Sequence, residues 1–240
     1  MRSLIFRWMS RNPTLEAHAA TCDPLIIAED LEVRPPAADG RRSRLSFTLS
    51  KGATLFLVGP KGSGKSAALD LLSFHGAPAR GRLELLGDDP TRLSPRDRPR
   101  MRRRVGFVFQ DQRLFSDLDV FGNVAIAGRA ADRRREDCIE EANQLLTWVG
   151  LGGRGKDRIT QLDDAERSRL CLARALINSP EILLVDEPTA GLDDKASRSL
   201  VRLIAAVGGA GTAVVFATRN PNLIQIAGAA VCRISDPFSL

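Results

Sequence analysis

The sequence predicts an α/β fold built around a parallel β-sheet. Apolar runs at 54–58, 182–185 and 213–217 are typical of strands buried on both faces, and 105–109 predicts a further strand. Stretches of helical periodicity separate these runs, which favours a parallel sheet because parallel strands require long crossover connections. The longest such stretch, residues 115–178, predicts a helical insertion in the middle of the sheet.

The other elements follow from shorter patterns. Residues 25–28 predict a strand, residues 35–40 predict a turn, and the apolar–polar alternation of 45–49 predicts a half-buried strand. Helical periodicity of apolar residues predicts helices at 67–74, 136–149 and 165–177.

Residues 1–24 are predicted to form an extension separate from a domain at 25–240. The extension begins with arginines among large apolar residues and has no acidic residue before Glu16. Its apolar stretch is too short, and too often broken by arginine, for a signal peptide. Two interpretations stay open: a disordered terminus, or an amphipathic segment on an anionic membrane surface.

The composition excludes several classes of protein. A chain with 43% hydrophobic and 27% charged residues fits neither a disordered nor a membrane protein, and no apolar run approaches the roughly 20 residues of a membrane span. The four cysteines form no CxxC pair and there are only two histidines, so a disulfide framework and a zinc site are not expected. The net charge is +6, but the arginine-rich segment 96–104 lacks interleaved aromatics, so no nucleic-acid partner is predicted.

Residues 59–66 match the phosphate-binding pattern G-x-x-x-x-G-K-[ST] without a mismatch. A buried strand is predicted before them and a helix after them, which is the context this loop requires. Glycines let backbone N–H groups surround a phosphate, the lysine reaches the β- and γ-phosphates, and the serine hydroxyl binds Mg²⁺. The predicted ATP-binding residues are Gly59, Pro60, Lys61, Gly62, Ser63, Gly64, Lys65 and Ser66.

A pair of carboxylates supplies the second part of the predicted site. Asp186 ends the buried run 182–185 and is expected beside the loop at the carboxyl edge of the sheet, where it can hold Mg²⁺. Glu187 follows directly and is placed to polarise a water for attack on the γ-phosphorus. We therefore predict Asp186 as a metal ligand and Glu187 as the catalytic residue of an ATPase.

Together these motifs resemble the nucleotide-binding subunits of ABC transporters. Further matches are Gln110 with the Q-loop, 162–176 with the signature region, 187–193 with the D-loop and Ala217-Thr218-Arg219-Asn220 with the H-loop. The resemblance implies that Gln110 is a nucleotide and magnesium ligand. It also implies a RecA-like P-loop NTPase core, a helical subdomain at about 111–178, a small N-terminal antiparallel β part, and ATP and Mg²⁺ as cofactors.

Within this family, the segment 102–126 most resembles the cell-division ATPases of the FtsE group. The resemblance implies a polytopic membrane partner of the FtsX type, docked between Gln110 and Val124, and control of peptidoglycan hydrolysis at the cytoplasmic face of the inner membrane. It also implies a homodimer or heterodimer through the nucleotide face. The alternative within the family is the ATPase of a lipoprotein-release or MacB-type machine.

Several positions depart from the family pattern. Asp163, Asp164 and Ala165 replace the serine and glycines of the signature LSGGE, Arg167 replaces the glutamine that follows it, Arg219 replaces the H-loop histidine, and 33–35 offer no aromatic for adenine. In an ABC dimer the signature contacts the γ-phosphate bound to the opposite subunit, where carboxylates would meet a like charge. Since removing one transition-state donor costs roughly 10²–10³-fold in rate, we expect weak hydrolysis.

The degenerate residues leave alternatives open. Asp163 and Glu166 form the pattern of a capping box, so that helix end can be satisfied by its own side chains. Arg219 can instead pair with Asp163 or Asp164 of a second copy. A heterodimer with an intact signature on another ATPase would keep one active site, and an ATP-binding or even nucleotide-free scaffold would not hydrolyse ATP at all.

Overall fold

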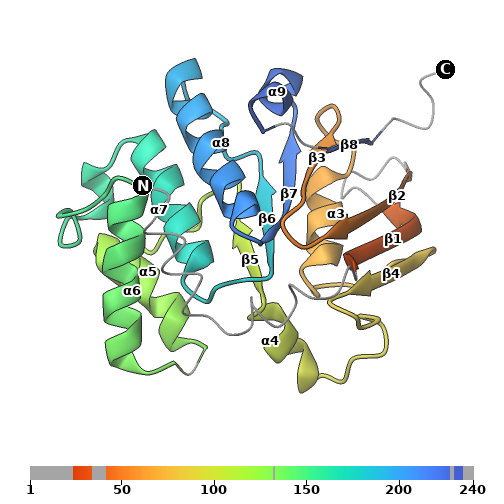
Figure 1. Ribbon diagram of the computed structural model, residues 1–240, viewed down its shortest axis with the longest axis horizontal. Helices are drawn as coiled ribbons and strands as arrows, with labels where there is room; N and C mark the ends of the chain where they lie inside the picture. The colour runs from red at the N-terminus through yellow and green to blue at the C-terminus, as the bar shows by residue number, and fades with distance from the viewer. Residues whose placement is uncertain (1–23, 34–41, 132, 228–229, 235–240) are drawn as a thin grey trace.

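Two β-sheets of different kinds are present in the computed structural model, which describes residues 24–33, 42–131, 133–227 and 230–234. The larger sheet is parallel, in the order β5-β6-β7-β3-β8, and the smaller is antiparallel, in the order β2-β1-β4 (Figure 1). The α/β fold with a parallel core and a small antiparallel part is therefore confirmed. The strands are β1 (Pro24–Val33), β2 (Ser43–Ser50), β3 (Thr54–Val58), β4 (Arg82–Leu85), β5 (Val105–Val108), β6 (Ile182–Asp186), β7 (Ala213–Thr218) and β8 (Ala230–Arg233).

The parallel sheet has apolar cores on both faces, as its continuous apolar strands predict. Along β6, Leu183 and Val185 belong to one core, whereas Ile182 and Leu184 belong to the other. This alternation follows from the two-residue period of a strand. In register, Val185 lies opposite Phe216 of β7, so both strands direct their carboxyl ends to the same edge.

Helices cover these two faces (Figure 1). Helices α5, α6, α7 and α8 pack on one face, and helix α3 with the antiparallel sheet packs on the other. Trp148 is buried at the end of α6. The helices are α3 (Lys65–Leu72), α4 (Asp97–Arg102), α5 (Val120–Arg129), α6 (Arg135–Trp148), α7 (Asp164–Leu176), α8 (Asp194–Gly209) and α9 (Ile224–Ala227), with short 3₁₀ turns at Ile159–Gln161 and Pro221–Leu223.

Some predicted boundaries are wrong by one or more residues. The helix predicted at 67–74 begins at Lys65 and ends at Leu72, because Phe74 has a left-handed φ of 60°. The strand predicted at 105–109 ends at Val108, and β1 begins one residue inside the predicted extension 1–24. The rest of that extension and the turn at 35–40 lie outside the described residues.

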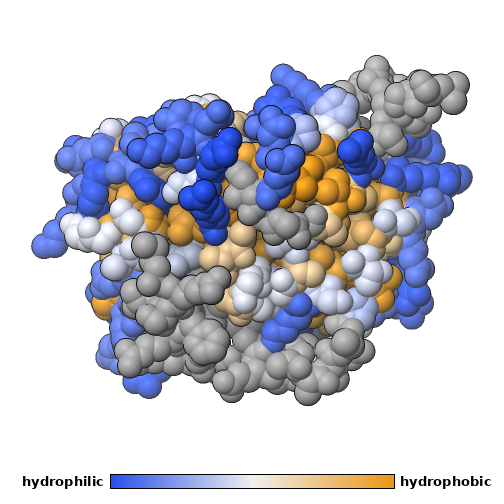
Figure 2. Space-filling view, turned by 45° about the horizontal axis from the view of Figure 1, so that its top comes forward, coloured by the Kyte–Doolittle hydropathy of each residue, from blue (hydrophilic) through white to orange (hydrophobic). Residues whose placement is uncertain are grey.

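Figure 2 turns the upper edge of Figure 1 towards the viewer, and the parallel strands point to this edge. A hydrophobic band crosses the face between strongly polar groups of side chains. Among the described residues, no helix is both long and apolar enough to cross a membrane.

Candidate functional site

The predicted phosphate-binding loop connects β3 to α3, as its motif requires. Gly62 and Gly64 have φ angles of 82° and 96°, a left-handed conformation that glycine adopts without strain. The side chain of Lys65 folds back over the loop, and its Nζ donates hydrogen bonds to the carbonyl oxygens of Gly59 (2.8 Å) and Pro60 (2.9 Å). The lysine therefore lies across the loop whose backbone is expected to hold phosphate.

Lys65 also faces Glu187, the predicted catalytic residue. The Lys65 Nζ atom lies 3.5 Å from Glu187 Oε1, and the two side chains are only 6% and 9% exposed. Burial lowers the pKa of Lys65 because it disfavours the charged form, while the charge of Glu187 acts in the opposite direction. Glu187 itself follows β6 with a left-handed φ of 44°, and its N–H donates to Ala217 O (3.0 Å).

Arg219, at the end of β7, contacts the same carboxylate. Its Nε donates to Glu187 Oε1 (3.1 Å) and its backbone N–H donates to Glu187 Oε2 (3.1 Å). The parallel pairing of β6 with β7 places Asp186 opposite Ala217, which brings the residues just after each strand together. The structure thus joins Lys65, Glu187 and Arg219 in one ion-pair cluster.

Asp186 and Ser66, the predicted magnesium ligands, are also neighbours. Burial raises the pKa of Asp186, and a hydrogen bond from Ser66 opposes this shift. The Asp186 Oδ1 atom is buried and accepts no hydrogen bond from any of the described residues. A buried, unpaired carboxylate oxygen beside a hydroxyl suits a small divalent cation that prefers oxygen ligands, so these residues fit Mg²⁺.

The signature region forms a helix start that is satisfied by the chain itself. Asp163 caps α7: its Oδ1 accepts from Glu166 N–H (2.7 Å), and Glu166 Oε2 accepts from Asp163 N–H (3.1 Å). Arg154 pairs with the other oxygen of Glu166, and Arg167 lies 3.4 Å from Asp164 Oδ1. The capping box expected from the sequence is therefore present.

Gln110 follows β5 and is exposed at the edge of the sheet. The loop behind it is attached to α7: Arg174 donates to the carbonyl oxygens of Gln112 (2.6 Å) and Arg113 (2.5 Å), and the Cys171 thiol donates to Gln112 O (3.3 Å). The sequence reasoning missed these contacts, since Cys171 and Arg174 show only the periodicity of an ordinary helix.

A groove of about 530 Å³ lies between this loop, β5 and α5. Its floor is apolar: the rings of Phe107 and Phe109 stack at 4.1 Å, and Phe115 is half exposed. Among the described residues, the charged side chains that line it are all arginines, namely Arg102, Arg103, Arg113 and Arg174. The docking surface predicted at Gln110–Val124 shares Arg113 and Phe115 with this groove, and the other lining residues lie in or next to α4, β5, α5 and α7.

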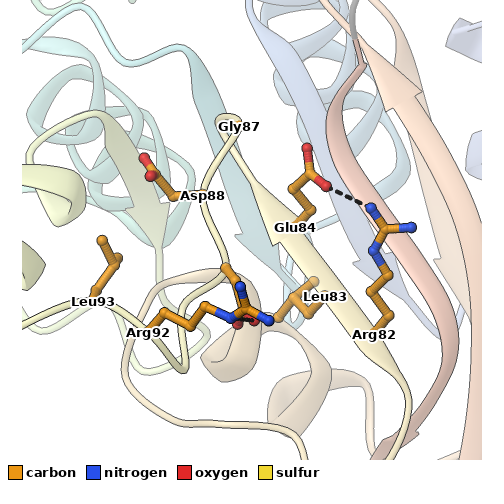
Figure 3. A pocket seen from close by; sticks show the side chains of 8 residues that line it. Arg82, Leu83, Glu84, Gly87, Asp88, Arg92 and Leu93 are labelled. Carbon is orange, nitrogen blue, oxygen red and sulfur yellow. Dashed lines mark hydrogen bonds and ion pairs between the residues drawn. The ribbon is translucent and has the colours of Figure 1, made fainter.

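A second cavity, of about 390 Å³, lies beside β4 (Figure 3). Two ion pairs lie in its lining: Arg82 pairs with Glu84 at 3.0 Å, and Arg92 pairs with Asp89 at 3.3 Å, while Asp88 adds a further carboxylate. The predicted site residues lie elsewhere, so this cavity is separate from the nucleotide loop.

Comparison with known proteins gives the relatives of this chain. Residues 43–190 match the family described as "ABC transporter". The chain is 36% identical over 192 residues to the cell division ATP-binding protein FtsE of Escherichia coli (strain K12), covering 80% of this chain and 86% of that protein. It is 34% identical over 184 residues to the lipoprotein-releasing system ATP-binding protein LolD 1 of Rhodopirellula baltica, covering 75% and 80%.

A solved structure confirms the fold. The dimeric post-hydrolysis state of the ATP-binding cassette MJ0796, bound to ADP and Pi, superposes with a TM-score of 0.76 at 23% identity, covering 88% of this chain and 94% of that one. The resemblance found in the motifs is therefore supported by sequence comparison over most of the chain. This chain belongs to the ABC transporter family and is, by architecture, an ABC-type ATPase related to the FtsE cell-division proteins.

Proposed function

We propose that this chain is the ATP-binding subunit of an FtsE-like ABC complex that works with a polytopic membrane partner in cell division. Residues 59–66 would hold the phosphates of ATP, and Ser66, Gln110 and Asp186 would hold Mg²⁺. Bound Mg²⁺ would neutralise charge on the phosphates. Glu187 would orient the attacking water. The complex would lie at the cytoplasmic face of the inner membrane and control peptidoglycan hydrolysis.

The observation that carries this proposal is the unpaired Oδ1 atom of buried Asp186 beside the phosphate-binding loop. Leaving a buried polar atom without a partner costs roughly 1–3 kcal/mol, so an arrangement of this kind is expected where a ligand completes it. The 36% identity to an FtsE protein over most of both chains supports the cell-division role.

Hydrolysis is proposed to be weak. The start of α7 offers carboxylates where the family pattern has serine and glycine, and the capping box already uses the N–H of Glu166. Lost transition-state donors typically cost 10²–10³-fold each. In a heterodimer, an intact signature from another ATPase would supply the missing donors, so one of the two sites would hydrolyse ATP at a higher rate.

The arginine-lined groove supports docking of the membrane partner. Its apolar floor suits an apolar side chain, and Arg113, which lies 4.0 Å above the ring of Phe109, adds positive charge to the rim. Since the charged lining residues in the described part of the chain are basic, we propose that the docking segment of the membrane protein carries acidic residues around an apolar anchor.

Mg-ATP binding and turnover by the purified chain test the proposal, with Lys65→Ala as the blank. Loss of the charged hydrogen bonds of Lys65 should weaken ATP binding about 10- to 100-fold, because each is worth roughly 1.5–3 kcal/mol. The control is Lys195→Ala, which removes an exposed lysine from α8. Equal ATP binding by the wild type and Lys65→Ala would contradict the proposal.

A related candidate is the ATPase of a lipoprotein-release machine, favoured by the 34% identity to LolD 1. The two functions predict different membrane partners. Affinity purification of the chain from its own cells, followed by identification of the permease retained, distinguishes an FtsX-type protein from a lipoprotein-release permease.

A further inference from the structure

We propose that Arg219 is a positioning residue that keeps Glu187 occupied, so that the site retains ATP rather than hydrolysing it. The inference rests on the proposed function, because it assigns Glu187 to the activation of water. It adds a specific regulatory contact within the same site, formed by a residue that departs from the family pattern.

Arg219 satisfies both oxygens of the Glu187 carboxylate. Its backbone N–H reaches Oε2 and its guanidinium Nε reaches Oε1, each at 3.1 Å. Glu187 is 9% exposed, whereas the side chain of Arg219 is 44% exposed, so the arginine covers the carboxylate from the solvent side. An uncharged side chain at position 219 would remove the positive charge from Oε1, while the backbone hydrogen bond to Oε2 would remain.

This contact affects Glu187 first. A carboxylate that orients or deprotonates water must accept a hydrogen bond from that water. Here Oε2 already accepts the N–H of Arg219, and Oε1 is shared between Arg219 and Lys65. When Lys65 moves to a phosphate, Arg219 remains on the carboxylate, so water still competes with a charged donor.

The contact also affects Lys65. To reach a phosphate, Lys65 must leave the carbonyl oxygens of Gly59 and Pro60 and the carboxylate of Glu187. Without Arg219, this departure would leave the buried carboxylate with no cationic partner from the described residues, which is costly. Arg219 supplies that partner, and therefore lowers the cost of releasing Lys65 to ATP.

Arg219 is thus expected to slow ATP turnover but to strengthen ATP binding. A residue with a merely structural role would be expected to support both. Replacing Arg219→Gln should raise kcat for ATP about tenfold, because a positioned general base contributes roughly 10²–10⁴-fold. The same variant should bind ATP about tenfold more weakly, because Glu187 then holds Lys65 more strongly. The kcat is measured by phosphate release, and the Kd by calorimetry with ATP and Mg²⁺.

Three further variants sharpen the test. Arg219→Lys keeps the charge and should stay close to the wild type, whereas Arg198→Gln, on the exposed face of α8, should change neither value. The double variant Glu187→Gln with Arg219→Gln should recover ATP affinity to about the wild-type value, because a neutral side chain no longer competes for Lys65. Its turnover should equal that of Lys65→Ala.

The outcomes distinguish this inference from the proposed function. A kcat for Arg219→Gln equal to or below that of the wild type, with ATP still bound, would overturn the role of Arg219 and leave the ATP-binding function standing. If the double variant stays as weak as Arg219→Gln, the competition for Lys65 is refuted. Absence of ATP binding by the wild-type chain would overturn both.

Discussion

The two halves of the candidate nucleotide site differ in whether their polar atoms are satisfied within the chain. In the half built by β3, α3 and β6, Asp186 Oδ1 is buried and unpaired among the described residues. In the half built by the start of α7, Asp163, Asp164 and Glu166 all have side-chain or backbone partners nearby. The first arrangement is suited to a ligand, whereas the second is already complete.

The difference shows how a degenerate site can remain well folded. A helix start left without a ligand needs other acceptors for its free N–H groups. At α7, Asp163 and Glu166 provide them reciprocally, and Arg154 neutralises Glu166. The start of α7 is thus capped by the chain itself, whereas the loop at 59–66 has the residues predicted to bind phosphate.

Among substitutions that test the difference between the two halves, Asp186→Asn is expected to have the largest effect. Removing the carboxylate charge should weaken Mg²⁺-dependent ATP binding by about 100-fold, since charge-assisted contacts to metal and phosphate are strong. Calorimetry with Mg²⁺ and with EDTA measures this directly. A similar affinity in both media for the wild type would show that Asp186 holds no metal.

The same substitution should stabilise the protein when no nucleotide is bound. Burial raises the pKa of Asp186 above its unfolded value, so the folded state binds the proton more tightly and loses stability as pH rises from the unfolded pKa through the folded one. Asp186→Asn removes this loss and should raise the free energy of unfolding at pH 7 by about 1 kcal/mol. Urea unfolding of both proteins at pH 7 and pH 4 tests this expectation. The difference in free energy of unfolding between Asp186→Asn and the wild type should be smaller at pH 4.

A smaller effect is expected in the other half of the site. Asp163→Ala removes the cap of α7 and should lower the free energy of unfolding by about 1 kcal/mol, the usual loss for such a cap. ATP affinity should stay unchanged, because the residue has its contacts within α7. A large loss of ATP affinity in Asp163→Ala would break the contrast between the two halves.

The smallest effect is expected from Asp164→Ala. This side chain is 69% exposed and lies 3.4 Å from Arg167, a surface ion pair of the kind that contributes at most about 1 kcal/mol. Urea unfolding should show a change within about 0.5 kcal/mol, and the comparison with Asp163→Ala isolates the capping interaction. If both variants lost the same free energy of unfolding, the loss in Asp163→Ala would not come from the capping hydrogen bond.

Much of the fold could be predicted from the sequence, because strands buried on both faces of a parallel sheet have continuous apolar runs. The strand predicted at 54–58 matches β3 without change, and those at 182–185 and 213–217 need one more residue each. The edge strands β4 and β8 were missed, because Arg82–Leu85 and Ala230–Arg233 are partly exposed and lack such a run. Their patterns are weaker because few of their side chains are buried.

The phosphate-binding loop, the carboxylates after β6 and the capping pattern at α7 could be predicted from the sequence, since each is a local motif whose chemistry depends on neighbouring residues. The contact between Arg219 and Glu187 could not be predicted from the sequence, because it depends on the parallel register between β6 and β7. The same holds for the contacts of Arg174 and Cys171 with the loop after Gln110, which join α7 to β5. Contacts between elements distant in sequence are set by packing, which no local pattern records.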